Sequence, residues 1–295
     1  MNKQTTLLVM SCDKYESAWF PYFSLLKKYW PQHPTRIILS TETKHYHHDG
    51  LDIQMSNSPP GTQWSDRLLL ALELVQTKYL VFSLEDFFLQ APVDHDTVLR
   101  CYNYMETNSD IAQFRFKNCD HPDQLKSLGS PVIRDFYSAG PDVIFRLDTQ
   151  IALWNTEWFR SFVIPGENPW QFETIGTQRV QNSPARFLWY HSECDPSDTG
   201  KLIFPYQMSL DSGYGISMGH WLWNNQHLFE CNHICADLST LGVISKAWVR
   251  YNLLVNKAVY QKAPGLFNRT FALTYRIIHK LRRVFSLIRH TKQER

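Results

Sequence analysis

Two adjacent carboxylates, Glu85 and Asp86, directly follow a strongly apolar run at positions 79–84. The run is typical of a buried strand in an α/β sheet, whose carboxyl edge is where ligands bind. Two acidic groups side by side at that edge repel each other and lose hydration, so a metal ion or a basic side chain has to offset the cost. The pair therefore indicates a site for a divalent cation that carries a phosphorylated ligand. The structural alternative is an exposed loop glutamate beside an aspartate that caps a helix or forms a turn.

A further acidic group, Glu173, ends the segment 170–173, which also contains two aromatic residues. Burial beside Trp170 and Phe172 would raise the pKa of its carboxyl towards the range in which a general base operates. A carboxylate in an aromatic-lined pocket suits the removal of a proton from an attacking hydroxyl group. The alternative is that both aromatic residues belong to the core and that Glu173 caps a helix or pairs with an arginine.

The elements that would position these groups alternate between strands and helices. This order predicts an α/β fold, Rossmann-like, with a mainly parallel central sheet flanked by helices. No change of composition marks a linker, so we expect one domain over residues 1–263, followed by a C-terminal extension over 264–295. The predicted strands lie at 5–10, 36–39, 51–55, 79–84 and 111–116, and the predicted helices at about 19–30, 64–76 and 96–106.

The composition is that of a folded protein, with 43% apolar residues among 295 and with 10 Trp, 14 Tyr and 18 Phe. Aromatic rings line many sugar and nucleobase clefts, although large cores also contain them. The six cysteines form no CxxC pair, and positions 1–10 suit a strand better than a signal peptide, so we expect a cytoplasmic protein. Cys231, His233 and Cys235 lack a second ligand pair at a suitable spacing, which disfavours a zinc site.

The C-terminal tail, residues 264–295, differs from the rest of the chain in charge. It contains eight Lys or Arg and a single acidic residue, so the tail carries +7 and the first 263 residues carry −5. Apolar residues between 267 and 288 follow one helical face, and basic residues lie on the opposite face. We therefore predict a basic amphipathic helix, peripheral on the anionic inner face of the cytoplasmic membrane. A helix packed on the domain is the alternative, and nucleic acid is disfavoured because the body is acidic and has no recognition motif.

The chain also carries four ordered segments: SCDKYESAWFPYFSLLKKYWP (11–31), WSDRLLLALELVQTKYLVFSLEDFFL (64–89), QIALWN (150–155) and NPWQFE (168–173). Together they resemble bacterial GT-A-type glycosyltransferases of surface-polysaccharide assembly, which build capsule, O-antigen and lipopolysaccharide. The resemblance covers most of residues 5–225. It implies a GT-A-like fold, with a nucleotide-sugar half over about residues 1–116 and an acceptor half over about 117–263.

The resemblance implies that the loops after the first two strands and the start of the next helix hold the donor nucleotide. Arg67 would approach the ribose or diphosphate, because a guanidinium can bind phosphate oxygens in pairs; a helix surface ion pair is the alternative. His220, where relatives tend to carry a lysine, would bind phosphate best when protonated. The implied nucleotide residues are Ser11, Cys12, Asp13, Thr41, Glu42, Asp66, Arg67 and His220, with Asp211 and Tyr214 in the same late loop as His220.

The resemblance also implies that the donor sugar and the acceptor lie against the segment 150–155 and Trp170. Trp154 would stack on a sugar ring, and a core position is its alternative. Glu173 is implied to be the general base that deprotonates the acceptor hydroxyl as it attacks C1 of the sugar with inversion. The implied substrate residues are Gln150, Trp154, Asn155 and Trp170.

Glu85 and Asp86 occupy the place of the family's DxD motif, which binds Mn or Mg on the donor diphosphate. The sequence departs from this motif, because Leu84 stands where the first Asp is expected. One carboxylate with phosphates and water can still hold Mg, whereas basic residues would stabilise the leaving group without a metal. Metal dependence is therefore left open by the sequence.

The predicted function is the transfer of a sugar from a nucleoside-diphosphate sugar to a hydroxyl of a surface glycan, with an acceptor built on a lipid carrier. A nucleotidyltransferase is the first alternative; such enzymes usually carry a Gly-rich loop after the first strand, which is missing here. A non-catalytic sugar-binding module is the second, and it would need no nucleotide pocket. The donor sugar, nucleobase, acceptor and linkage are not specified by the sequence.

Overall fold

The computed structural model describes residues 3–119, 122–126, 128–193, 201–206, 215–217, 219–245 and 247. The chain divides into two units, Met1–Val243 and Ile244–Arg295, and the first contains every residue of the candidate site. The expected amphipathic helix at 264–295, and Asp211 and Tyr214 of the late loop, lie outside the described residues. Within the described part of the chain, no helix has both the length and the apolar character needed to cross a membrane.

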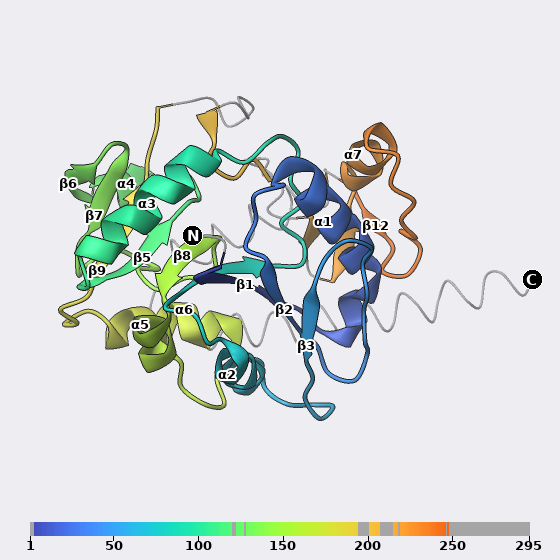
Figure 1. The fold of residues 1–295 in the computed structure, drawn as a ribbon, viewed down its shortest axis with the longest axis horizontal. Coiled ribbons are helices and arrows are strands. Elements are labelled where there is room, and N and C mark those ends of the chain that lie inside the picture. Colours follow the sequence, from blue (N-terminus) through green and yellow to red (C-terminus); the bar gives the residue numbers. More distant parts are fainter. Residues whose placement is uncertain are drawn as a thin grey trace, which may run out of the picture. The chain divides into compact units, whose positions relative to one another are not determined.

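A nine-stranded sheet forms the centre of the first unit, with the strand order β3-β2-β1-β4-β8-β5-β9-β7-β6 (Figure 1). The strands β1 to β4 are parallel, as predicted. However, β8 is antiparallel to both β4 and β5, and β7 is antiparallel to β9, so the sheet is mixed and the prediction of a mainly parallel sheet is corrected. The strands are β1 (Thr5–Met10), β2 (Arg36–Ser40), β3 (Ile53–Ser56), β4 (Tyr79–Leu84), β5 (Ile111–Arg115), β6 (Leu128–Ile133), β7 (Phe136–Ala139), β8 (Ala152–Asn155) and β9 (Arg186–Tyr190).

Helices cover both faces of this sheet (Figure 1). α1 (Glu16–Tyr29) and α3 (His95–Thr107) pack on one face, and α2 (Trp64–Leu74), α5 (Thr156–Phe162) and α6 (Pro169–Arg179) pack on the other. The side chains of β1 alternate between the layers: Leu7 and Val9 face the first set of helices, and Leu8 and Met10 face the second. The remaining elements are η1 (Asp13–Tyr15), α4 (Pro122–Lys126), α7 (Asn225–Cys231) and a small sheet of β10 (Ile216–Ser217), β11 (His220–Leu222) and β12 (Val243–Ile244).

Local sequence signals set the starts of the helices near the candidate site. Asn168 caps α6 in a capping box with Gln171, and Pro169 occupies the first turn. Asp94 caps α3 by accepting from the N–H of Thr97 at 3.0 Å. The capping box fixes the first turn of α6, which leads into Glu173.

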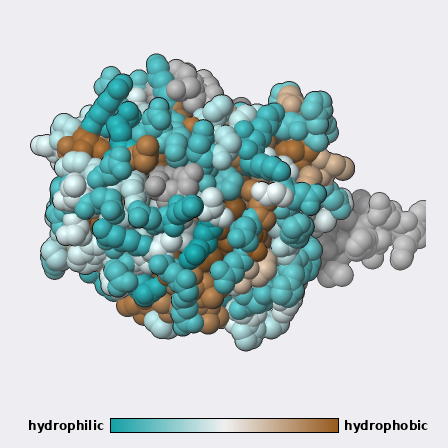
Figure 2. Space-filling model, in the orientation of Figure 1, coloured by the Kyte–Doolittle hydropathy of each residue, from teal (hydrophilic) through white to brown (hydrophobic). Residues whose placement is uncertain are grey.

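The surface of the molecule is largely hydrophilic in the view of Figure 2, with hydrophobic residues gathered in separate patches. Isolated apolar side chains on a surface are normal and require no functional explanation. Among the described residues, the large apolar side chains that remain exposed are Phe20, Ile144, Ile164, Trp170, Ile175 and Val243.

Candidate functional site

The topology brings three loops together at the carboxyl edge of the sheet. The chain leaves β1 for β2 and β3 on one side, and then forms β4 on the other side of β1. Met10 pairs with both Ser40 and Leu84, so the segments that follow these three residues emerge side by side. In open α/β sheets, such a reversal of strand order is where ligands bind. The residues expected after β1, β2 and β4 are therefore neighbours.

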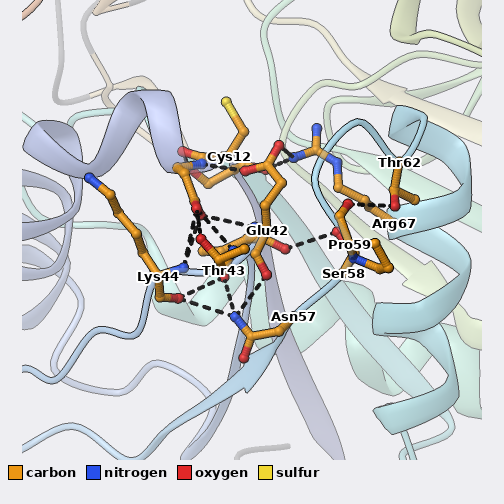
Figure 3. Close-up of polar contacts among 12 residues, drawn as sticks. Cys12, Glu42, Thr43, Lys44, Asn57, Ser58, Pro59, Thr62 and Arg67 are labelled. Carbon is orange, nitrogen blue, oxygen red and sulfur yellow. Dashed lines mark hydrogen bonds and ion pairs between the residues drawn. The ribbon is translucent and has the colours of Figure 1, made fainter.

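Asp13 and Glu42 join the loops after β1 and β2 by reciprocal hydrogen bonds. Figure 3 labels Glu42, Thr43 and Lys44 of the loop after β2. The Asp13 carboxylate accepts from the backbone N–H groups of Glu42, Thr43 and Lys44 at 2.9 to 3.2 Å, and Glu42 accepts from the N–H of Asp13. Burial alone would raise the pKa of Asp13, but the hydrogen bonds from Thr43, Lys44 and Glu42 lower it to about 2. Asp13 is therefore ionised, and its carboxylate holds the two loops together.

Arg67 extends from the first turn of α2 to the same loops (Figure 3). Its side chain is only 10% exposed, and Nη1 donates to Glu42 Oε1 at 2.6 Å and to the carbonyl of Ser11 at 3.0 Å. Arg67 is thus a buried link between α2 and the loops, and the alternative of a surface ion pair does not hold. Contact with phosphate remains a prediction. Asp66, the other expected residue on α2, accepts from the N–H of Gly166 at 3.2 Å.

Ser11, Thr41 and Cys12 complete these loops. Ser11 and Thr41 are buried: Ser11 accepts from Trp19 Nε1 at 2.7 Å, and the Thr41 hydroxyl donates to a carbonyl of its own loop at 3.1 Å. Cys12 is partly exposed, and burial followed by the negative charge of Glu85 raises the pKa of its thiol to about 11. The thiol is therefore protonated at neutral pH and lies within the field of Glu85.

Glu85 and Asp86 emerge from β4 with only 7% and 8% of their surfaces exposed. The Asp86 carboxylate accepts from the N–H of Ile216 at 3.2 Å, and the Asp86 carbonyl accepts from the N–H of Gly215 at 3.1 Å. Burial raises the pKa of Asp86 to about 7, and burial together with the Asp86 charge raises the pKa of Glu85. The pair therefore retains protons at pH values where ordinary carboxyl groups are ionised.

Metal binding by these two carboxylates remains a prediction, and their chemistry fits it. Carboxylate oxygens are the donors that Mg and Mn prefer, and a cation beside two buried acids would favour their ionised forms. In the part of the chain that the structure describes, no group of three or more His, Cys, Asp or Glu side chains is placed to hold a metal. Phosphate oxygens and water would therefore have to complete the coordination.

Glu173 lies on α6 and contacts the turn that precedes β8. Its Oε1 accepts from the backbone N–H of Thr149 at 2.9 Å and from the Thr149 hydroxyl at 2.6 Å. Burial raises the pKa of Glu173, the negative charge of Asp148 acts in the same direction, and the bonds from Thr149 oppose them. The expected direction is confirmed, but an aromatic-lined pocket is not its cause, because Trp170 is 55% exposed and Phe172 lies in the core.

The turn at 148–150 rests on a buried ion pair that the sequence did not indicate. Asp148 Oδ2 lies 2.8 Å from Arg115 Nε, and both side chains are 4% exposed. The Arg115 guanidinium lies over the Trp189 ring at 4.1 Å, and Asp148 Oδ1 accepts from the N–H of Gln150 at 3.2 Å. This pair links the end of β5 to the turn that holds Glu173. No local pattern could have revealed it, because the partners are far apart in the chain.

The segment 150–155 is divided between the two edges of the sheet. Gln150 lies before β8, where its Oε1 accepts from the Tyr206 hydroxyl at 3.2 Å. Trp154 is fully buried and stacks on an aromatic ring of α5 at 4.6 Å, so its core alternative holds. Asn155 pairs with Tyr79 at the opposite edge, where it caps α5. The structure thus contradicts substrate contacts for Trp154 and Asn155, because β8 runs antiparallel to β4 and leads away from the site.

His220 lies in β11, where its Nδ1 is hydrogen-bonded to the carbonyl of Leu241. The turn before it approaches the loop after β1, since a side chain at Gly219 would come within 2.5 Å of Lys14 Nζ. Gly219 also has a φ of +79°, which favours glycine. Lys14 is therefore a basic group of this region that was not among the expected site residues, although its place directly after Asp13 could have suggested it.

No protein-family model matches this sequence, and no curated protein matches it. Distant structural similarity is found to glycosyltransferase and nucleotidyltransferase structures. S. aureus TarS 1–349 in complex with UDP has a TM-score of 0.42 and 12% identity, with 90% of this chain and 74% of that chain covered. A cytidylyltransferase from Leptospira borgpetersenii serovar Hardjo-bovis has a TM-score of 0.43 and 12% identity, with 88% and 98% covered. A UDP-glucose pyrophosphorylase complexed with UDP-glucose has a TM-score of 0.42 and 9% identity, with 64% and 90% covered.

This chain spans 59% and 36% of the length of two further TarS structures. At such identities and TM-scores, the similarities do not assign a function to the chain.

Proposed function

We propose that this protein is a glycosyltransferase that moves a sugar from a nucleoside-diphosphate sugar to a hydroxyl group of a surface-glycan acceptor, with inversion at C1. The observation that supports it is the combination of two acidic centres at one edge of the sheet. Glu85 and Asp86 follow β4 at the reversal of strand order, and Glu173 is hydrogen-bonded to the turn before β8. Transfer requires a place for the leaving diphosphate and a separate base, and these centres have the chemistry for both.

In the proposed reaction, Glu173 removes the proton of the acceptor hydroxyl while the hydroxyl oxygen forms a bond to C1 of the donor sugar. The bond from C1 to the diphosphate oxygen breaks, and its electron pair leaves with the nucleoside diphosphate. Thr149 holds Glu173 Oε1 by two hydrogen bonds, so Oε2 would take the proton. The raised pKa of Glu173 brings its basicity closer to that of an acceptor at neutral pH.

The leaving diphosphate is proposed to lie between Lys14 and the pair Glu85 and Asp86. A Mn or Mg ion held by these carboxylates would neutralise the diphosphate charge. The acceptor is proposed to be lipid-linked, because the basic tail at 264–295 has the sequence pattern of a helix on an anionic membrane surface.

A nucleotidyltransferase is the second candidate, and Lys14 is the observation that favours it. Such enzymes place a basic group after the first strand to bind a triphosphate, and Lys14 occupies that position. They also use a Gly-rich loop there, whereas the loop after β1 contains no glycine and its backbone is held by Asp13 and Glu42. Glycosyl transfer therefore accounts for more of the site.

The substitution Glu173→Gln tests the proposal. We expect it to abolish incorporation of a labelled sugar into membrane glycolipid while leaving nucleotide binding nearly unchanged. Glu157→Gln is the matched control, because Glu157 is an 85% exposed acid on α5. Wild-type turnover by the Glu173→Gln variant would refute the base assignment.

Donor class is tested separately by thermal shift. UDP, GDP, CMP and their sugars are added with and without Mn, and a nucleotide that binds the folded chain raises its melting temperature. If no nucleotide stabilises the protein, the proposal of a nucleotide-sugar enzyme is wrong and a sugar-binding module is favoured.

A further inference from the structure

A cavity opens at the carboxyl edge of the sheet, away from the reversal of strand order. It has a volume of about 560 Å³ and lies between the first turns of α3, the turn joining β6 to β7, and the end of β9. Such a volume is typical of sites for small ligands, which occupy roughly 300–1,000 Å³. None of the residues expected from the sequence to bind nucleotide or substrate lines it.

The cavity is connected to the candidate base by one short segment. β9 lies three strands from β4, which corresponds to about 14 Å along the edge. Residues 201–206 run along this distance and are held by hydrogen bonds from the N–H groups of Gln90 and Asp94. Ile203 lines the cavity, and Tyr206 donates to Gln150, the neighbour of the Glu173-binding Thr149.

The charged residues that line the cavity include equal numbers of acids and bases. A sugar hydroxyl both donates and accepts hydrogen bonds, so it is best bound where carboxylates and cationic donors alternate. A phosphate would instead require an excess of positive charge, which the lining does not provide. The acids are Asp94, Asp96 and Asp135, and the bases are Arg100, Arg134 and Lys201.

An apolar recess adjoins the polar cavity. It has a volume of about 200 Å³, and Thr97, Arg100 and Arg134 line both spaces. Its other walls are mainly apolar and include Ile133 and Phe136. A ligand that fits both spaces is polar over most of its surface and carries one small apolar group, such as the methyl of an acetamido sugar.

The rim of the cavity has a fixed backbone. Asp135 has a φ of +61°, a conformation that residues other than glycine adopt infrequently. The N–H of His191, just after β9, donates to the carbonyl of Asp135 at 2.8 Å and holds the turn against the strand end. Unusual backbone conformations retained in this way cluster at ligand sites.

We propose that this cavity is a saccharide subsite that binds an acetamido-sugar unit of the acceptor glycan, remote from the reacting hydroxyl. Its assignment to an acceptor rests on the proposed function. The distance of about 14 Å to β4 means that further units of the same glycan would have to link the bound unit to the point of transfer.

Saturation-transfer NMR on the full chain tests the subsite with chitotriose as the probe and maltotriose, which lacks the acetamido group, as the comparison. We expect chitotriose to bind more tightly than maltotriose. Arg100→Gln and Asp96→Asn should each weaken chitotriose binding by about tenfold, the effect of losing one charge-assisted hydrogen bond. Both residues are exposed on α3, so the variants should fold. Glu157→Gln, which changes an 85% exposed acid on α5, is the control and should bind chitotriose like the wild type.

Two outcomes overturn the subsite: chitotriose does not bind the wild type, or it binds both α3 variants with unchanged affinity. Binding of UDP, GDP and CMP, measured on the same samples, separates this result from the proposed function. Nucleotide binding without chitotriose binding refutes the subsite alone, whereas chitotriose binding without any nucleotide binding refutes the transferase and leaves a sugar-binding site.

Discussion

The substitution Asp86→Asn should make the stability of the protein less dependent on pH. Asp86 is 8% exposed, and its pKa in the folded chain is about 7, against an ordinary value of 3.8. Between these pH values the unfolded carboxyl has released its proton while the folded one retains it. The folded state then binds more protons, so the free energy of unfolding falls as the pH rises.

The size of the effect follows from the same two values. The interval from 3.8 to about 7, at about 1.36 kcal/mol per pH unit, corresponds to a loss of about 4 kcal/mol. Asparagine has no proton to lose, and its carbonyl can still accept from the N–H of Ile216. Wild type and Asp86→Asn should therefore be similarly stable at pH 4, and the variant should be more stable by about 4 kcal/mol at pH 8.

Urea unfolding followed by tryptophan fluorescence, in buffers containing EDTA, measures this difference. Partly buried histidines whose pKa is lowered, such as His33, change stability in the opposite direction over part of this range. Their contribution is common to both proteins and cancels in the comparison. Asp13→Asn is the control, because the pKa of Asp13 is lowered to about 2. This variant should be less stable than wild type at pH 7. The difference in free energy of unfolding between the two proteins should disappear only below pH 4. Parallel stability curves for wild type and Asp86→Asn from pH 4 to 8 would refute the reasoning.

Two further predictions concern the buried ion pairs. Arg67→Met should lower the free energy of unfolding by about 3 kcal/mol, because it leaves Glu42 without its cation. A double-mutant cycle, measured by urea unfolding, tests the interaction between the two residues. The double variant Arg67→Met, Glu42→Gln should lose less free energy of unfolding than the two single variants lose together. Equal losses would contradict the interaction. Asp148→Asn should lower the pKa of Glu173 and Arg115→Gln should raise it, since these charges act on it with opposite sign. Carbon-13 NMR of labelled glutamate measures the pKa of Glu173 in each variant, with its signal assigned from the Glu173→Gln protein. If the two variants change this pKa in the same direction, the prediction is wrong.

The parts of the site that depend on buried parallel strands could be predicted from the sequence. A continuous apolar run identifies a buried strand, and parallel strands end at the same edge, so the meeting of Asp13, Glu42 and Glu85 follows from β1, β2 and β4. The direction of the Glu173 pKa shift was also predictable, because burial disfavours any ionised carboxyl. Its cause was not predictable, since the surroundings of Glu173 come from the turn at 148–150 rather than from its neighbours in the chain.

The direction of β8 could not be predicted. Its four residues, Ala152–Asn155, are apolar until the last, and this pattern is equally compatible with a parallel or an antiparallel strand. Direction is decided by pairing with β4 and β5, which are distant in the sequence. Because β8 is antiparallel, Gln150 lies at the carboxyl edge near the site, Trp154 is buried in the core and Asn155 lies at the opposite edge. The antiparallel direction of β8 therefore places two of the four expected substrate residues away from the carboxyl edge of the sheet.

The charges around the reversal of strand order are not equally free to bind a ligand. Arg67 already neutralises Glu42, and a phosphate that recruited it would have to compete with a buried ion pair whose loss costs about 3–5 kcal/mol. Asp86 would instead exchange a proton for a cation, and at pH 7 ionising a group with a pKa of about 7 costs less than about 1 kcal/mol. A ligand that brings a divalent cation to Glu85 and Asp86 needs less rearrangement than one that binds Arg67 directly.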